Sequence, residues 1–187
     1  MPVGLGCGIS GGFDVTCADL RRPGGLFRTA WVFNLDDLRV PINVELSTYI
    51  TTLEFLTYRS LYQFSSTKYS HEANWAEQIS DGGNISYLQT VTLRVPNFDP
   101  TTDKVIEDAS VSDLGVITRN NAGEYQIWGA ENGLSANAST TGGTGRQSTD
   151  SAFTTLVLEG TERFLPKRLL VGGTDAQTLA YLLAASV

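Results

Sequence analysis

A run of alternating residue types between positions 85 and 95 constrains the fold of this chain more than any other feature. Ile85, Tyr87, Gln89, Val91, Leu93 and Val95 alternate with Ser86, Leu88, Thr90, Thr92 and Arg94. Successive side chains of a β-strand point to opposite faces, so this period of two predicts a long strand with one buried face. The turn formers Asp81-Gly82-Gly83-Asn84 precede the run, and Pro96 ends it.

The rest of the chain predicts more strands and one helix. Strands are expected at 26–35, once or twice within 47–64, at 66–80, in a hairpin of 116–119 and 125–128, and finally at 152–159 and 163–171. Asp99 is a good N-cap, Pro100 suits the first helical position, and Val105, Ile106 and Ala109 follow at helical spacing. We therefore predict a mainly β fold: an antiparallel β-sandwich or small barrel with one flanking α-helix, long loops and extended terminal arms.

Three segments lie outside this pattern within a single β-rich domain of residues 1–187. Residues 1–27 are an irregular, glycine-rich N-terminal arm. Residues 134–151 contain no large apolar side chain between Leu134 and the end of the segment, which predicts a long loop. The tail, 174–187, is rich in Ala and Leu and predicts either a short helix or a strand-like arm. Its apolar residues are too many for a free tail, so we expect it to pack on its own domain or on a neighbouring subunit.

Composition disfavours several classes of function. One His and two Cys argue against a metal site, and a net charge of −7 argues against a sequence-independent grip on nucleic acid. No apolar run approaches the ~20 residues of a membrane span. The glycine cluster 4–12 has no strand before it, as a dinucleotide-binding loop requires. We expect no cofactor, no metal, no membrane span and no catalytic activity.

The remaining candidate groups have simpler interpretations. His71 stands beside Glu72, but no nucleophile accompanies it, so a surface histidine is expected. Asp36-Asp37 is interpreted as the turn after a strand rather than a carboxylate pair. Cys7 and Cys17 are expected to be reduced thiols, and the N-terminus lacks the pattern of a signal peptide, which predicts folding in a cytoplasm.

Acidic residues are concentrated in one part of the chain. Residues 97–131 hold seven acids and two bases, which is −5 of the net −7. This predicts that the helix and the following hairpin form one acidic region. Such a region either serves solubility or keeps a passing polyanion from adhering.

Several stretches resemble tailed-bacteriophage virion proteins. Gly123–Ala136 holds an aromatic hairpin strand followed by the corner Gly-Ala-Glu-Asn-Gly-Leu (129–134), and Thr141–Gly160 holds a Gly/Thr/Ser loop followed by Asp150-Ser-Ala-Phe-Thr and a strand. Residues 14–26 and Asn34-Leu-Asp-Asp-Leu38 resemble the opening of such proteins. The resemblance covers about half of the chain and is closest to tail tube proteins.

The resemblance implies a virion tail subunit, assembled in the host cytoplasm, that forms stacked hexameric rings with other tail proteins. DNA would pass through the tube without specific binding. The arm 1–27, the loop 134–151 and the tail 174–187 would be assembly elements. The interface candidates are Asp19, Arg21, Arg22, Asn132, Leu134, Arg146, Asp150, Leu179 and Leu182. The candidates for an acidic lumen are Asp103, Glu107, Asp108, Asp113 and Glu124.

Two other functions stay open at this stage. One is a head–tail joining, ring or capsid-decorating virion protein, which only its stoichiometry in the particle would separate from a tube protein. The other is a carbohydrate- or cell-surface-binding β-sandwich whose aromatic side chains stack on sugar rings. The aromatic candidates are Trp31, Trp75, Trp128, Tyr49 and Tyr58. Their even spread in strand patterns favours core positions instead.

Overall fold

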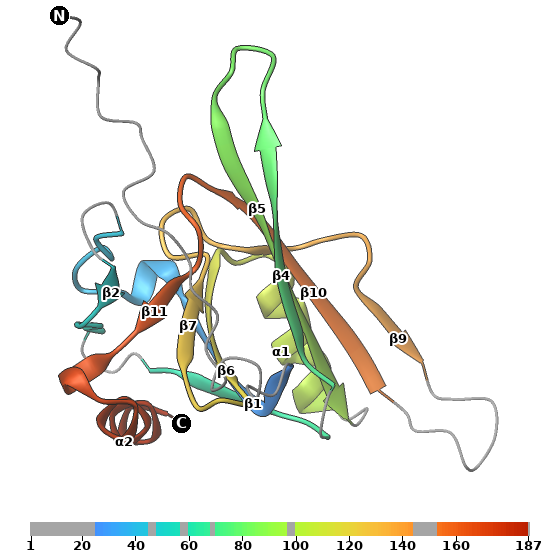
Figure 1. Cartoon of the computed structure of the whole chain (residues 1–187). Helices are drawn as coiled ribbons and strands as arrows, with labels where there is room; N and C mark the ends of the chain where they lie inside the picture. Colours follow the sequence, from blue (N-terminus) through green and yellow to red (C-terminus); the bar gives the residue numbers. More distant parts are fainter. Residues whose placement is uncertain are drawn as a thin grey trace, which may run out of the picture.

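A computed structural model describes residues 25–44, 48–56, 60–67, 70–96, 100–143 and 153–186 (Figure 1). The strands are β1 (Leu26–Asn34), β2 (Tyr49–Ile50), β3 (Tyr62–Ser65), β4 (Glu72–Ile79), β5 (Ile85–Pro96), β6 (Leu114–Asn120), β7 (Tyr125–Trp128), β8 (Ser135–Ala136), β9 (Thr141–Gly143), β10 (Phe153–Glu162) and β11 (Lys167–Leu169). The helices are α1 (Pro100–Ser110) and α2 (Asp175–Ala185), with short 3-10 turns η2 (Leu35–Asp37) and η3 (Val171–Gly173).

The strands form two sheets. Sheet I has the order β2-β11-β7-β6-β1-β3, and sheet II has the order β4-β5-β10-β8, with β9 also paired to β10. All of these pairs are antiparallel except β2 with β11. Neither sheet closes on itself, so the architecture is a sandwich rather than the small barrel that the sequence also allowed.

The central strands of sheet I, β1, β6 and β7, are buried on both faces, and this produces two apolar cores. Trp31, Phe33 and Ile117 lie in a core shared with α2 and the segment after β1. Ala30 and Val32 point the other way, into a core shared with sheet II. A strand covered on both faces has no polar face, which explains the continuous apolar run within β1.

The two helices cover different parts of this sandwich. α1 contributes Ala109 and the partly buried Ile106 to the core between the sheets. α2 packs on the opposite face of sheet I, where Leu182 is fully buried (Figure 1). Thr174 caps α2 by accepting the Gln177 backbone N–H at 3.2 Å, which satisfies a donor of the first turn.

The structure confirms most of the predicted elements. β1, β5, α1, the β6–β7 hairpin and β10 lie where the patterns predict them, with small differences at their ends. On β5 the buried residues Gln89, Val91 and Leu93 belong to one predicted side. Asp36-Asp37 lies in the turn η2, as expected.

The tail 174–187, which the sequence leaves open between a short helix and an arm, contains the helix α2. Three predictions about the fold need correction. The loop 134–151 contains β8 and β9, which pair with β10 over two and three residues. The strand expected at 163–171 extends only over β11. The arm 1–27 ends at Gly25, since Leu26 already belongs to β1; residues 1–24 lie outside the described part.

Gly115 provides a test of how closely sheet I packs. It lies opposite Phe33 in the β1–β6 register, and a Cβ at this position would overlap the Phe33 ring. Phe33 is fully buried, so it has no room to move aside. We predict that Gly115→Ala lowers the free energy of unfolding by about 1–3 kcal/mol in urea titration. Gly143→Ala is the matched control, because nothing lies within 4 Å of its Cβ position. Equal stability of the two variants would contradict this packing.

Candidate assembly surface

The β4–β5 hairpin projects from the body of the protein as a two-stranded ribbon (Figure 1). β4 pairs with β5 without a register shift from Glu72–Thr92 to Ile79–Ile85. β10 covers the other edge of β5 only as far as Tyr87. Among the described strands, none pairs with the end of the ribbon as a third strand, and β4 is an open edge of sheet II along its whole length.

The ribbon exposes apolar side chains that a solvated hairpin does not need. Trp75, Ile79 and Ile85 are 49%, 68% and 53% exposed. Ile79 and Ile85 face each other across the strands next to the turn. The ring of Trp75 contacts that of Tyr87 edge-on, with centroids 5.9 Å apart. An isolated two-stranded ribbon is marginally stable in water, and an open apolar edge invites pairing with another chain.

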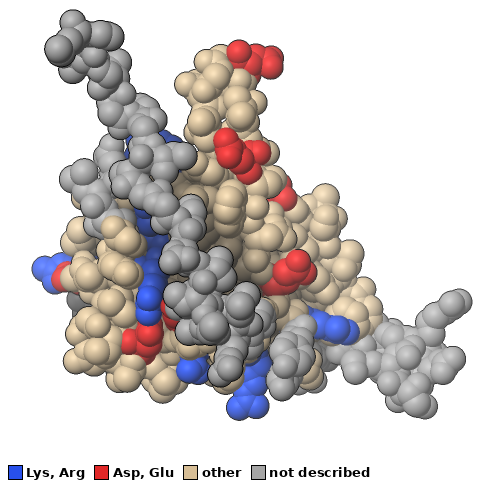
Figure 2. Space-filling view, in the orientation of Figure 1, with Lys and Arg blue, Asp and Glu red and all other residues tan. Residues whose placement is uncertain are grey.

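The charge of the ribbon has one sign. Glu72, Glu77 and Asp81 are its only formally charged residues between positions 72 and 93. In Figure 2 acidic atoms mark the tip and the length of the projection, and no basic atom is visible on it. Two ribbons brought together would therefore repel each other. A partner surface that contacts the ribbon is therefore expected to be less acidic than the ribbon.

The outward face of sheet II is a second open surface. The residues of β5 that alternate with its buried positions are mostly small and polar, including Thr90 and Thr92. On β10 the buried residues Thr154, Leu156 and Leu158 face the core, so the residues between them face outward. The described helices and sheet I lie on the other side of sheet II, which leaves this face uncovered by them (Figure 1).

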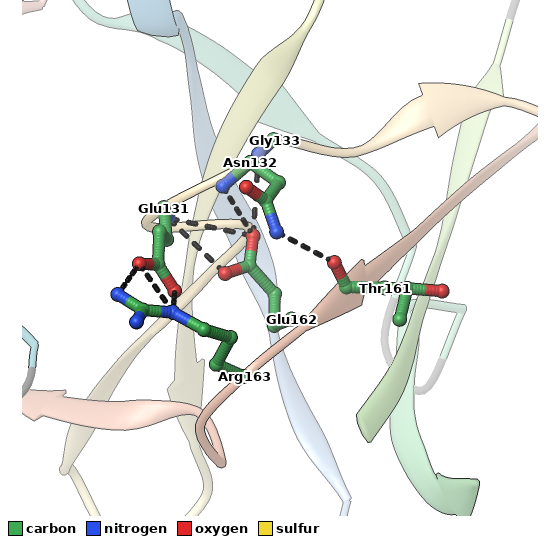
Figure 3. Close-up of polar contacts among 6 residues, drawn as sticks. All are labelled: Glu131, Asn132, Gly133, Thr161, Glu162 and Arg163. Carbon is green, nitrogen blue, oxygen red and sulfur yellow. Dashed lines mark hydrogen bonds and ion pairs between the residues drawn. The ribbon is translucent and has the colours of Figure 1, made fainter. Parts of the chain in front are cut away.

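The corner after β7 is held by a buried carboxylate (Figure 3). Glu162, at the end of β10, is 3% exposed and accepts the backbone N–H groups of Glu131 at 3.2 Å, Asn132 at 2.9 Å and Gly133 at 3.2 Å. Burial raises the pKa of the Glu162 carboxyl, although these three donors oppose the shift. Arg163 forms an exposed ion pair with Glu131 on the outer side of the same corner.

Two further contacts fix this corner against sheet II. Gly160 passes so close to the Gly133 carbonyl that a Cβ at position 160 would overlap it. The buried amide of Gln89 accepts the Gly129 backbone N–H at 3.0 Å and donates to the Phe164 carbonyl at 2.9 Å. The corner 129–134, which belongs to one of the stretches that resemble virion proteins, thus lies at the junction of the two sheets. Gly160 is required at this junction because a larger residue would overlap the Gly133 carbonyl.

The predicted interface residues fall into four groups. Asp19, Arg21, Arg22, Arg146 and Asp150 lie outside the described residues. Asn132 is exposed, with its side-chain amide donating to the Thr161 carbonyl at 2.9 Å. Leu134 and Leu182 are fully buried in the two cores, so they are not available to another subunit in this conformation. Leu179 is partly buried against the same core as Leu182.

The predicted acidic region is divided by the fold. Asp103, Glu107 and Asp108 lie exposed on α1, where Lys104 pairs with Asp108 at 3.3 Å. Asp113 precedes β6, whereas Glu124 follows it and pairs with Arg168 at 3.5 Å. The seven residues of β6 separate these two ends by roughly 20 Å, because a strand rises about 3.3 Å per residue. The helix and the hairpin turn therefore do not form one acidic surface.

His71 is a structural histidine and not the surface residue that the sequence suggested. It is 5% exposed at the start of β4. The Arg94 backbone N–H donates to Nδ1 at 3.3 Å, and Nε2 donates to the Arg28 carbonyl at 3.1 Å. Burial lowers the pKa of the imidazole. The sequence around His71 does not distinguish a buried histidine from an exposed one.

A groove lies at the base of the ribbon. It has a volume of about 420 Å³ and is lined by Leu26, Ala73, Asn74, Trp75, Gln126, Trp128, Leu165 and Pro166. Trp31 and Trp128 are buried, as the core interpretation of the aromatic residues predicts, whereas Trp75 and Tyr49 are not. Tyr58 lies outside the described residues.

Within the described ranges, no group of three or more His, Cys, Asp and Glu side chains is placed to hold a metal ion. In the same ranges, no helix combines the length and the apolar character needed to cross a membrane. Comparisons with protein families, with curated proteins and with solved structures found no match. Function is therefore inferred from the geometry of this chain.

The contribution of the Glu162 carboxylate to the stability of the corner can be tested by substitution. We predict that Glu162→Ala lowers the free energy of unfolding by about 2–4 kcal/mol, because three backbone donors lose their acceptor. Arg163→Ala, which removes the exposed pair with Glu131 and the contact with the Phe164 ring, should cost less than about 1 kcal/mol. Urea titration of both variants measures the difference. Equal losses would show that the corner does not depend on Glu162.

The raised pKa of Glu162 predicts a pH dependence with a definite sign. The folded protein holds this proton more tightly than the unfolded chain, whose carboxyl has the ordinary glutamate pKa of 4.5. The stability of the wild type relative to Glu162→Gln should therefore fall as the pH rises from 4.5 through the folded pKa. Urea titrations of both proteins between pH 4 and pH 8 measure this difference, and a difference that rises with pH would contradict it.

Proposed function

We propose that this chain is a self-assembling structural protein of a virion, most like the ring-forming subunit of a phage tail tube. The observation that carries the proposal is the projecting β4–β5 ribbon, with its open edge and its exposed Trp75, Ile79 and Ile85. In a monomer the open edge and the apolar side chains of the ribbon are exposed to water, whereas an assembly would cover both. The stretches that resemble phage virion proteins support the same class.

The two edges of sheet II suit a repeated contact between copies. β4 is open at one edge, and at the other edge β10 is covered only by the short strands β8 and β9 among the described residues. Because the acidic ribbon repels a second ribbon, its partner surface is a different part of the neighbouring copy. Contacts between unlike surfaces close into rings or extend into filaments.

In such a ring we assign the channel to the outward face of sheet II. Its Ser and Thr side chains are uncharged, and the one cation on its described strands, Arg94, is partly buried with its guanidinium group over the Phe153 ring, so the face offers little for DNA phosphates to bind. α1 packs on the other side of sheet II, so its acids would not line this channel. A reconstruction of assembled particles by electron cryo-microscopy tests the assignment, and a channel lined by α1 would overturn it.

The ribbon tip gives the test of assembly. Ile79→Lys combined with Ile85→Glu replaces the apolar pair by an opposite-charge pair, which preserves the hairpin. We predict that the wild type forms rings or tubes in light scattering and negative-stain images, and that the double variant remains monomeric with an unchanged thermal midpoint.

Val111→Lys is the matched control, because Val111 is 88% exposed after α1 and away from the ribbon. This variant should assemble like the wild type. A wild type that stays monomeric at high concentration, or a double variant that assembles normally, would contradict a role of the ribbon in assembly. Single rings that never stack would favour the head–tail joining or ring protein instead.

A second candidate function, binding of carbohydrate, is favoured by one observation. Trp75 is half exposed beside a groove that the polar residues Asn74 and Gln126 also line. Sugar-binding sites combine an aromatic platform with such polar groups. A glycan screen tests it: binding that is lost in Trp75→Ala but kept in Ile79→Lys would establish this function, and absence of binding would remove it.

A further inference from the structure

His71 lies where the chain passes from sheet I to sheet II. β3 ends at Ser65 in sheet I, and β4 begins at Glu72 in sheet II. The imidazole bonds to both layers, since Arg28 belongs to β1 of sheet I and Arg94 to β5 of sheet II. It is the only histidine of the chain.

The ring completes hydrogen bonding that the strands leave unfinished. The β4–β5 register ends at Glu72–Thr92, so Arg94 lies two residues beyond the last β4 partner. Nδ1 of His71 accepts the Arg94 N–H in place of a strand carbonyl. The Arg28 carbonyl accepts both Nε2–H of His71 and the Ser66 N–H, the latter at 2.9 Å. One side chain thus adds hydrogen bonds between the base of the ribbon and sheet I to the apolar contacts of Ala73 and Val91 with that sheet.

We infer that His71 is a pH-sensitive latch that holds the base of the β4–β5 ribbon onto sheet I. The geometry requires the neutral tautomer with its proton on Nε2, because Nδ1 must accept the Arg94 N–H. If Nδ1 also carried a proton, its N–H and the Arg94 N–H would point at each other, and neither could accept a hydrogen bond from the other. Protonation therefore breaks the bond to β5 and favours the state in which the ribbon base has separated from β1.

The surrounding charges do not stabilise a histidine cation. Two of the strands that contribute its backbone partners carry Arg28 and Arg94, whose guanidinium groups lie over the rings of Phe27 and Phe153. A further backbone partner is Phe64 of β3, which is uncharged. Glu72, the nearest acid along the chain, is exposed and points to the opposite face of β4. The other titratable groups on the strands that pack around this position lie further along them: Tyr62 of β3, Glu77, Tyr87, Glu159 and Glu162.

The direction of the effect follows from burial. The pKa of His71 is lowered from 6.5, so the opened state binds the proton more tightly than the closed state. The closed latch is fully stable above pH 6.5 and weakens as the pH falls towards the lowered pKa. The latch affects only how firmly the ribbon is attached to the rest of the protein. The inference therefore does not depend on a role of the ribbon in assembly.

The full-length protein allows a direct test, because its nuclear magnetic resonance spectrum has one histidine signal. We expect the pKa of His71 to lie below 6.5. The protection factor of the Arg94 amide, which is the intrinsic exchange rate divided by the observed rate, should fall up to tenfold per pH unit between 6.5 and that pKa. Amides of Ile117 and Ile127, in the middle of sheet I, should keep their protection.

His71→Gln is the matched variant, because its amide can accept from Arg94 and donate to Arg28 without titrating. In this variant the pH dependence of Arg94 protection should disappear. The latch would be overturned by a His71 pKa at or above 6.5, by Arg94 protection that ignores pH, or by an unchanged dependence in His71→Gln. Loss of protection at Ile117 in parallel with Arg94 would indicate global unfolding and would also overturn it.

Discussion

Burial of both faces of sheet I is the constraint on which the rest of the structure depends. Trp31 and Phe33 alternate with Ala30 and Val32, so β1 delivers apolar side chains to two separate cores. One face then requires α2 and the segment after β1 as a cover, and the other requires sheet II. Sheet II is left with one open face, and its β4–β5 ribbon projects past the layers that cover the rest. The candidate assembly surface is thus what remains after the central sheet has been covered.

Passages between the two layers use buried polar partners. Backbone groups at a corner leave the ladder of one sheet before they join the other, and a buried donor without an acceptor is costly. Glu162 supplies the acceptor for the corner after β7, Gln89 joins that corner to β5, and His71 supplies the acceptor beyond the end of β4. The three buried polar side chains therefore act as structural hydrogen-bond partners at layer crossings. Two of them titrate, with opposite consequences: a lower pH favours the folded state at Glu162 and disfavours the closed state at His71.

Sequence patterns predicted the elements whose signal is local. The alternation of β5, the turn formers before it and the helical spacing of α1 depend on neighbours within a few residues, and these elements are present. β8 and β9 could not be predicted, because two or three residues become strands only by pairing with β10. The tail stayed open between helix and arm, since α2 is apolar around most of its surface. Leu134 and Leu182 are interface candidates only through the resemblance, which makes the loop and the tail assembly elements, and the core partners that bury them are distant along the chain.

The candidate site was less predictable than the fold for the same physical reason. Nothing in the sequence distinguishes Glu162 or His71 from an exposed acid or histidine, because their roles depend on backbone donors that are distant along the chain. The predicted acidic region failed because β6 carries Asp113 and Glu124 to opposite ends of one strand.

The ribbon restricts what an assembly of this chain can look like. A symmetric dimer through two ribbons would place Glu72, Glu77 and Asp81 of both copies in one contact, and like charges in a strand pair are destabilising. In the proposed assembly the apolar tip would therefore need a different surface on its neighbour, and each copy would present one donor surface and one acceptor surface. Such contacts repeat from copy to copy until the rotation closes them. A ring or tube satisfies every ribbon in the assembly, whereas an open chain leaves one exposed at its end.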